Sequence, residues 1–233
     1  MKIYAISDLH LSTSCDKPMD IFGGNWEGYT EKIKTNWLSK ITDDDIVLIS
    51  GDISWAMKLE EATSDIEWIN KLPGTKIIIK GNHEYWWKSI SSVRAILPDS
   101  IKAIQNDAIK IGNYIICGTR GWTVAESGKE LTPEDLKIYK REVERLKLTL
   151  MSAKVLKTSN QDKIIAMMHF PPFNLDKEDS DFTKLFEEYN VDTVVFGHLH
   201  GYVNCDKITL KNDIKYYFTS CDHINNNPIL IYE

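Results

Sequence analysis

Residues 3–10 read Ile-Tyr-Ala-Ile-Ser-Asp-Leu-His, a short apolar run that ends in an aspartate and a histidine. Four consecutive apolar residues followed at once by polar ones are typical of a buried β-strand that stops at a loop. Similar apolar, β-branched runs recur along the chain and predict further buried strands. They cover residues 46–49, 76–79, 114–117, 164–167 and 193–196.

Helical patterns separate several of these strands, which predicts a layered α/β domain. They cover residues 31–39, 59–72 and 180–189. Two segments depart from the alternation. Residues 109–116 read as a hairpin with a two-residue Gly112-Asn113 turn, and residues 207–232 alternate like short antiparallel strands. We therefore expect either one mixed sheet or two sheets packed face to face.

Residues 133–157 form a charged, strongly helical stretch that we interpret as a helical insertion. Thr132 precedes Pro133 and Glu134, which is a good amino-terminal cap for a helix. The helix is expected to serve as a lid or as a flank, and its pattern does not decide between them. The length of 233 residues and the lack of a linker favour one domain over 1–233.

Composition argues against several classes of partner. The net charge of −6 and the lack of a basic block argue against general binding to nucleic acid or to a membrane surface. The first residues are too briefly apolar for a signal peptide, so we expect a cytoplasmic protein. The cysteines are widely spaced and are expected to be reduced thiols. They are Cys15, Cys117, Cys205 and Cys221.

Five of the six histidines fall in short polar motifs, each directly after an apolar run, and His223 is left over. The carboxyl ends of strands in an α/β sheet lie along one edge, so these motifs are expected to converge there. Oxygen and nitrogen ligands together suit divalent cations that activate water. The motifs are Asp8-Leu9-His10, Gly51-Asp52, Gly81-Asn82-His83-Glu84, Met168-His169 and Gly197-His198-Leu199-His200.

In order and spacing this set resembles the calcineurin-like metallophosphoesterase superfamily, over the stretch from Asp8 to His200. The resemblance implies an α/β/β/α sandwich with two mixed sheets flanked by helices, and a centre with two divalent metal ions. Two alternative interpretations are a set of core histidines without a metal and a metal-binding scaffold without catalysis. The intact ligand set argues against both.

The resemblance also implies which residue holds which metal. Asp52 is expected to bridge the two ions. Manganese, iron or zinc fits these donors, and we favour manganese. By position in the motifs, the first ion is expected on Asp8, His10 and His200, and the second on Asn82, His169 and His198.

The predicted reaction is hydrolysis of a phosphate ester by a hydroxide that bridges the metals, with Asp52 and His83 as catalytic residues. His83 is expected to protonate the leaving oxygen, with Glu84 beside it as a partner rather than a metal ligand. Many relatives have aspartate in place of Glu84, which puts the pairing in doubt. The alternative for His83 is a purely hydrogen-bonding residue.

Arg120, Trp86 and Trp122 are the residues expected to contact the substrate. The arginine suits a bidentate phosphate clamp, and tryptophans near the motifs suit stacking on a base or sugar; Trp55 and Trp26 are further candidates. The alternatives are a structural salt bridge and loop packing.

We expect a small phosphodiester or nucleotide-like substrate. The alternatives are a phosphomonoesterase, a protein phosphatase or a non-catalytic scaffold. Oligomeric state is left open.

Overall fold

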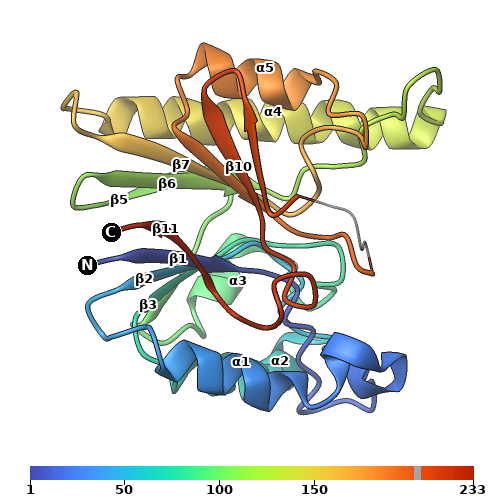
Figure 1. The fold of residues 1–233 in the computed structure, drawn as a ribbon, viewed down its shortest axis with the longest axis vertical. Helices are drawn as coiled ribbons and strands as arrows, with labels where there is room; N and C mark the ends of the chain where they lie inside the picture. Colours follow the sequence, from blue (N-terminus) through green and yellow to red (C-terminus); the bar gives the residue numbers. More distant parts are fainter. Residues whose placement is uncertain (202–205) are drawn as a thin grey trace.

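The computed structural model describes residues 1–201 and 206–233. Figure 1 shows two β-sheets packed face to face between two layers of helices, the predicted α/β/β/α sandwich. The first sheet has the strand order β11-β1-β2-β3-β4. Its strands are β1 (Ile3–Ile6), β2 (Ile46–Ile49), β3 (Thr75–Ile78), β4 (Ile101–Ala103) and β11 (Ile229–Tyr232).

The second sheet has the order β5-β6-β7-β8-β10-β9. Both sheets are mixed, because a parallel centre carries an antiparallel strand at an edge: β11 beside β1 in the first sheet, and β5 and β9 at the two edges of the second. The strands of the second sheet are β5 (Ala108–Ile111), β6 (Tyr114–Thr119), β7 (Lys163–Met168), β8 (Thr193–Phe196), β9 (Ile208–Lys211) and β10 (Ile214–Phe218).

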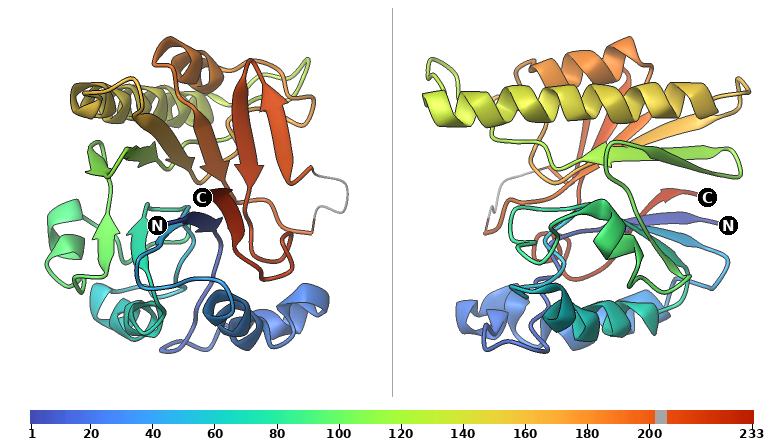
Figure 2. Two further views of the ribbon diagram at one scale, coloured as in Figure 1. Left: turned by 60° about the vertical axis from the view of Figure 1, so that its left-hand side comes forward. Right: turned by 180° about the vertical axis from the view of Figure 1, so that it is seen from behind.

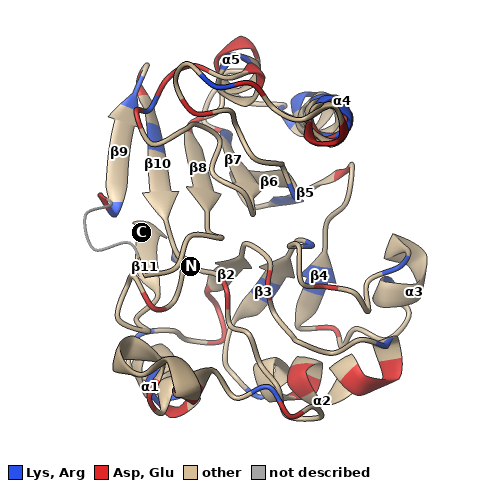
Figure 3. Ribbon diagram, turned by 90° about the vertical axis from the view of Figure 1, so that its right-hand side faces the viewer, with Lys and Arg blue, Asp and Glu red and all other residues tan. Residues whose placement is uncertain are grey.

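The helices divide between the outer faces of the two sheets, as the views in Figure 2 show. The helices α1 (Tyr29–Leu38), α2 (Leu59–Asn70) and α3 (Ile90–Arg94) lie on the side of the first sheet, with two short 3-10 helices before α1. The helices α4 (Pro133–Leu156) and α5 (Asp181–Glu188) lie outside the second. In Figure 3 residues of both charge signs are visible on α4.

The central strands have two buried faces, and their alternate residues enter different cores. Ile3 and Ala5 of β1 face the second sheet, whereas Tyr4 and Ile6 pack with the helices. Because side chains alternate along a strand, a fully apolar run contributes to two layers at once. Each such side chain contributes about 1.5–3 kcal/mol on burial, which explains why the core strands are almost purely aliphatic.

The predicted elements agree closely with the observed ones. The hairpin turns at Gly112-Asn113, with Ile111 opposite Tyr114, and the tail forms β9, β10 and β11. The sequence did not predict the parallel pairing of β10 with β8, nor the short elements α3 and β4.

Helix α4 flanks the second sheet. The Thr132 hydroxyl accepts the amide of Asp135 at 3.1 Å, which confirms the predicted cap. Leu146, Leu150 and Ala153 pack in the core formed with β6 and β7. Helix α4 is therefore one layer of the sandwich.

Three of the cysteines, Cys15, Cys117 and Cys221, are free thiols, as expected, and Cys205 lies outside the described residues. Over residues 1–201 and 206–233, no helix has the length and hydropathy needed to cross a membrane.

Lys76 on β3 is fully buried, and its ammonium donates to the Leu72 carbonyl at 2.6 Å. Burial lowers the pKa of Lys76 from 10.5 to about 8, and the charge of Asp43 offsets this only in part. At neutral pH the folded protein thus carries a poorly solvated charge. We expect Lys76→Met to raise the free energy of unfolding at pH 7 by about 1–3 kcal/mol.

The difference in free energy of unfolding between Lys76→Met and the wild type should shrink between pH 8 and 10. In that window wild-type Lys76 is neutral when folded and protonated when unfolded, so wild-type stability rises with pH. Denaturant unfolding of both proteins from pH 7 to 10 measures the difference. The exposed Lys71→Met is the matched control. A gain that stays constant with pH would contradict the buried-charge explanation.

Candidate metal centre

The predicted ligands stand where parallel strands of both sheets end. Asp8, Asp52 and Asn82 follow β1, β2 and β3, whereas His169 and His198 follow β7 and β8. Backbone hydrogen bonds join the loops, from the amide of Asp8 to the Gly51 carbonyl and from the amide of Gly197 to the His169 carbonyl. The two sheets thus bring distant segments to one edge, as predicted.

The backbone is strained at this edge. Asp8, His10, Asp52 and His198 have φ values of 59°, 44°, 50° and 75°. Non-glycine residues in the left-handed region cost on the order of 1–3 kcal/mol each and persist only where packing fixes them. Four such residues in one cluster are typical of a functional site.

Two glycines allow the close approach of these loops. A Cβ on Gly81 would collide with the Asp52 carboxylate, and a Cβ on Gly197 would collide with the carboxylate of Asp8. Both positions therefore require glycine.

Asp8, His10 and His200 form one group of potential ligands, with their donor atoms within 4.8 Å of one another. The Nε2 atoms of His10 and His200 lie 3.2 Å apart, and His200 Nε2 lies 3.5 Å from Asp8 Oδ1. Asp8 is held in place by the Ser220 hydroxyl, which donates to its Oδ2 at 2.8 Å.

Asp52, His169 and His198 form the second group, again within 4.8 Å. His169 Nε2 lies 3.2 Å from His198 Nδ1, 3.4 Å from Asp52 Oδ2 and 2.6 Å from Asn82 Oδ1. The same Asp52 oxygen lies 3.8 Å from His10 Nε2 in the first group. Asp52 thus stands between the groups, where a bridging carboxylate belongs.

The donor atoms fit divalent cations. His169 Nδ1 lies 3.0 Å from the Ser50 carbonyl, and His200 Nδ1 lies 3.0 Å from Asp222 Oδ1. Donation of the Nδ1 proton to these acceptors leaves the Nε2 lone pair of each ring facing its group, an arrangement common for metal-binding histidines. A cation within each group would accept the lone pairs that face each other at 3.2 Å.

Each group combines two kinds of imidazole. Burial lowers the pKa of His10 and of His198 to about 4. Burial also opposes a positive charge on His169 and His200, but nearby carboxylates outweigh it. Asp52 raises the pKa of His169 to about 9. Asp222 and Asp8 raise the pKa of His200 to about 10. Since a ligand imidazole must be neutral, cation binding would displace protons from His169 and His200.

The carboxylates keep their negative charge despite burial. Burial opposes ionisation of Asp52, but the charge of His169 outweighs it and lowers the pKa to about 2. For Asp8, the hydrogen bond with His200 and the neighbouring histidine charges likewise hold the pKa well below its ordinary range.

Comparison with known proteins agrees with this geometry. The family model of the calcineurin-like phosphoesterases matches residues 1–202. The chain belongs to this family. It is therefore a hydrolase of phosphate esters in a family that depends on divalent metal.

Individual relatives are distant. The chain is 24% identical over 211 residues to a "probable cyclic nucleotide phosphodiesterase" of Coxiella burnetii, covering 86% of this chain and 76% of the relative. Phosphopantetheinyl hydrolase from Mycobacterium tuberculosis shares the fold with a TM-score of 0.56 and 14% identity, over 94% and 89% of the chains. The protein TT1561 of Thermus thermophilus has a TM-score of 0.59 at 12% identity, over 99% and 97%.

Glu84 has a different place in this phosphoesterase from the one expected. Its fully buried carboxylate does not pair with His83. It accepts four backbone amides at 2.5–3.4 Å, one from Gly81 and three from the loop 52–54. Burial and the Asp52 charge raise the pKa of Glu84 to about 7, although the amides oppose this rise. Glu84 therefore ties the loop after β2 to the loop after β3.

His83 lies beside the groups and is not a member of either. Its Nε2 is 3.9 Å from Asp52 Oδ2, and its amide donates to Asp52 Oδ1 at 2.9 Å. The imidazole packs against Trp55 with ring centroids 4.3 Å apart. Within the described residues its Nδ1 has no hydrogen-bond partner.

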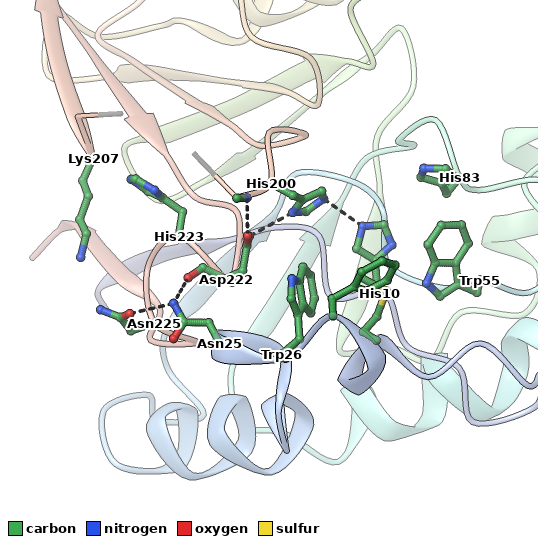
Figure 4. Close-up of a pocket in the computed structure, with 14 residues that line it drawn as sticks. His10, Asn25, Trp26, Trp55, His83, His200, Lys207, Asp222, His223 and Asn225 are labelled. Carbon is green, nitrogen blue, oxygen red and sulfur yellow. Dashed lines mark hydrogen bonds and ion pairs between the residues drawn. The ribbon is translucent and has the colours of Figure 1, made fainter. Parts of the chain in front are cut away.

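A pocket of about 860 Å³ opens beside the first group (Figure 4). We call it the aromatic pocket. Trp26 and Trp55 form walls next to His10, His83 and His200. The Trp55 ring stacks on His10 with centroids 4.8 Å apart.

The three expected substrate contacts lie elsewhere. Trp86 is 1% exposed in the core under the first sheet, so no substrate reaches it and that prediction was wrong. Trp122 packs on Phe170 and donates to Asp135, outside the aromatic pocket. Arg120 lines a separate pocket and pairs with Glu142, which favours the salt-bridge alternative.

Asp222, which the sequence analysis missed, supports His200 through Nδ1 and accepts the Gly201 amide at 3.1 Å. It follows β10, whose parallel place beside β8 was not predicted. The rule that polar residues after a parallel strand join the site would have found it.

We expect Glu84→Gln to lower the free energy of unfolding by about 2–4 kcal/mol, because an amide group would face backbone donors that have no other acceptor. Metal content after dialysis should fall with it. The exposed Glu60→Gln serves as the control. Denaturant unfolding and metal analysis measure both effects. If Glu84→Gln were as stable as the wild type, Glu84 would not hold the two loops together.

Asp222→Asn should weaken metal binding by about ten-fold, since the carboxylate orients His200 and raises its basicity. Folding should change little. Competition with a chelator measures the affinity, and the exposed Asp176→Asn is the control. Equal affinities would show that His200 needs no carboxylate partner.

Proposed function

We propose that this phosphoesterase hydrolyses a small phosphodiester with a nucleotide-like organic group, at a centre of two divalent ions for which manganese is the favoured metal. The observation that carries the proposal is the aromatic pocket, which opens directly on His10, His83 and His200. The name of the Coxiella relative, a probable cyclic nucleotide phosphodiesterase, supports the diester class.

The proposed roles are those that the family resemblance implies, and the two groups of potential ligands support them. Asp8, His10 and His200 would hold one ion, Asn82, His169 and His198 the other, and Asp52 would bridge them. Bound there, two divalent ions supply Lewis acidity that polarises a phosphate ester and lowers the pKa of water. The buried protein dipoles and charges keep these groups fixed during the reaction.

His83 is the proposed general acid. Its ring lines the aromatic pocket near Asp52 and is half-buried, so it can reach the leaving oxygen of an ester seated there. Its backbone amide on Asp52 fixes the start of the side chain, and Trp55 limits the ring's rotation. A proton donor in this position helps most when the leaving group is a poor one.

The aromatic pocket supplies the proposed binding surface for the organic group. Trp55 and Trp26 offer aromatic surface, and Phe22, which is 68% exposed, also lines the pocket. Asn25, which donates to the Asp222 carbonyl at 2.6 Å, adds a polar edge. Aromatic faces with a few polar groups are typical of sites for bases and sugars.

The first test is hydrolysis of 4-nitrophenyl phosphate and bis(4-nitrophenyl) phosphate, with Mn²⁺ added or chelated. We expect metal-dependent turnover with the diester preferred, and a loss of at least about 10³-fold in Asp52→Asn. Metal analysis of both proteins accompanies the assay. Turnover that survives chelation, or two bound ions without turnover of either ester, would refute the proposal.

The second test addresses His83. His83→Asn should lower kcat by about 10²-fold for diesters with alkyl leaving groups and far less for 4-nitrophenolate, which leaves without a proton. Metal content should stay at the wild-type level. An equal loss with every leaving group would mean that His83 only positions Asp52.

A further inference from the structure

A second pocket, of about 230 Å³, lies between the ends of β3, β4 and β6 and helix α4. We call it the arginine pocket. It shares no lining residue with the aromatic pocket. Five of its lining residues are cations, namely Lys80, Lys88, Arg120, Arg141 and Arg145.

One buried carboxylate organises three of these cations. Glu142 of α4 is fully buried, and its Oε1 lies 2.8 Å from Arg145, 3.4 Å from Arg120 and 3.6 Å from Arg141. Thr119 donates to the other oxygen at 3.0 Å. Three guanidinium groups share one acceptor atom, so most of their N–H donors are left for another partner.

The charges in the arginine pocket do not balance. Five cations and one carboxylate, that of Glu142, line the pocket, a local excess of four positive charges on a chain with a net charge of −6. Three of the cations contact Glu142, and the Lys80 ammonium donates to the Trp87 carbonyl at 2.6 Å. Within the described residues the buried Nε of Arg120 has no hydrogen-bond partner. A concave site with converging, unsatisfied donors of one charge sign is suited to a small anion.

We infer that the arginine pocket binds a tetrahedral oxyanion of the phosphate class. Its volume equals that of roughly seven or eight waters at about 30 Å³ each, enough for one such group and part of its hydration. Planar guanidinium groups bind two oxygens of a phosphate at once, which a lysine cluster alone does not.

The arginine pocket adjoins the metal centre through the backbone. The Arg120 carbonyl accepts the amide of His169 at 3.1 Å, and Lys80 precedes Asn82 by two residues. The oxyanion is thus either free phosphate or a second phosphate group on the substrate. Only the second source rests on the proposed function.

The test variant is Lys88→Gln/Arg141→Gln. Both side chains are exposed, and Glu142 keeps Arg120 and Arg145 as partners, so the fold should persist. The control is Lys140→Gln/Lys147→Gln, which removes two exposed cations from α4 outside the arginine pocket. The two proteins have the same net charge.

Binding of inorganic sulfate to the metal-loaded full chain is measured by calorimetry at constant ionic strength. We expect about ten-fold weaker binding in the test variant and wild-type binding in the control. Equal binding by wild type and both variants would overturn the inference, as would a loss seen only in Asp52→Asn, which would place the anion on the metals. This measurement needs no turnover, so it stands even if the proposed hydrolysis fails.

A second arm identifies the source of the phosphate. It compares kcat/KM for thymidine 5′-(4-nitrophenyl phosphate) with that for its 3′-phosphorylated form. A preference for the bisphosphate that is lost in the test variant assigns the arginine pocket to a substrate phosphate. No preference, with sulfate binding still lost in the variant, assigns it to free phosphate.

Discussion

The site depends on the Glu84 carboxylate and the four backbone amides around it. A buried carboxylate without donors would be costly, and buried amides without an acceptor would be equally so. Together they fix the loop after β2 on the loop after β3, with Asp52 held in a left-handed conformation between two ligand groups. The strain at Asp52 is tolerated because the surrounding hydrogen bonds leave the loop no alternative.

The sequence predicted that the motifs would converge at one edge, because each follows an apolar run that is typical of a buried strand. Asp8 and His169 lie close together because each follows a strand that ends at this edge. Partners of the ligands were harder to predict. Asp222 was missed because the strand before it, β10, has a parallel neighbour that no local pattern reveals. Glu84 was paired with His83 because the two are adjacent in sequence. Adjacency does not fix the direction of a side chain, and the Glu84 carboxylate turns to the backbone amides instead.

The positions of the aromatic side chains could not be predicted from the sequence either. Trp86 and Trp55 both follow a polar motif closely, yet one is in the core and the other forms a pocket wall. Burial of a tryptophan depends on which loop face meets the sandwich, a tertiary property. Arg120 was expected to clamp a phosphate of the substrate; its ion pair with Glu142 of α4, in a separate pocket, could be seen only in the fold.

The pairing of β11 with β1 also bears on how the molecule is made. Ile3 lies opposite Tyr232, and the termini lie side by side in Figure 1. Contacts this remote in sequence slow folding, because a long loop must close before they form. On the ribosome β1 can pair with β2 early, but its pairing with β11 must wait until residues 229–232 have been made. Ser220 and Asp222 reach the ligands almost as late. A nascent chain therefore lacks the hydrogen bonds from Ser220 to Asp8 and between Asp222 and His200 until residues 220–222 have been made.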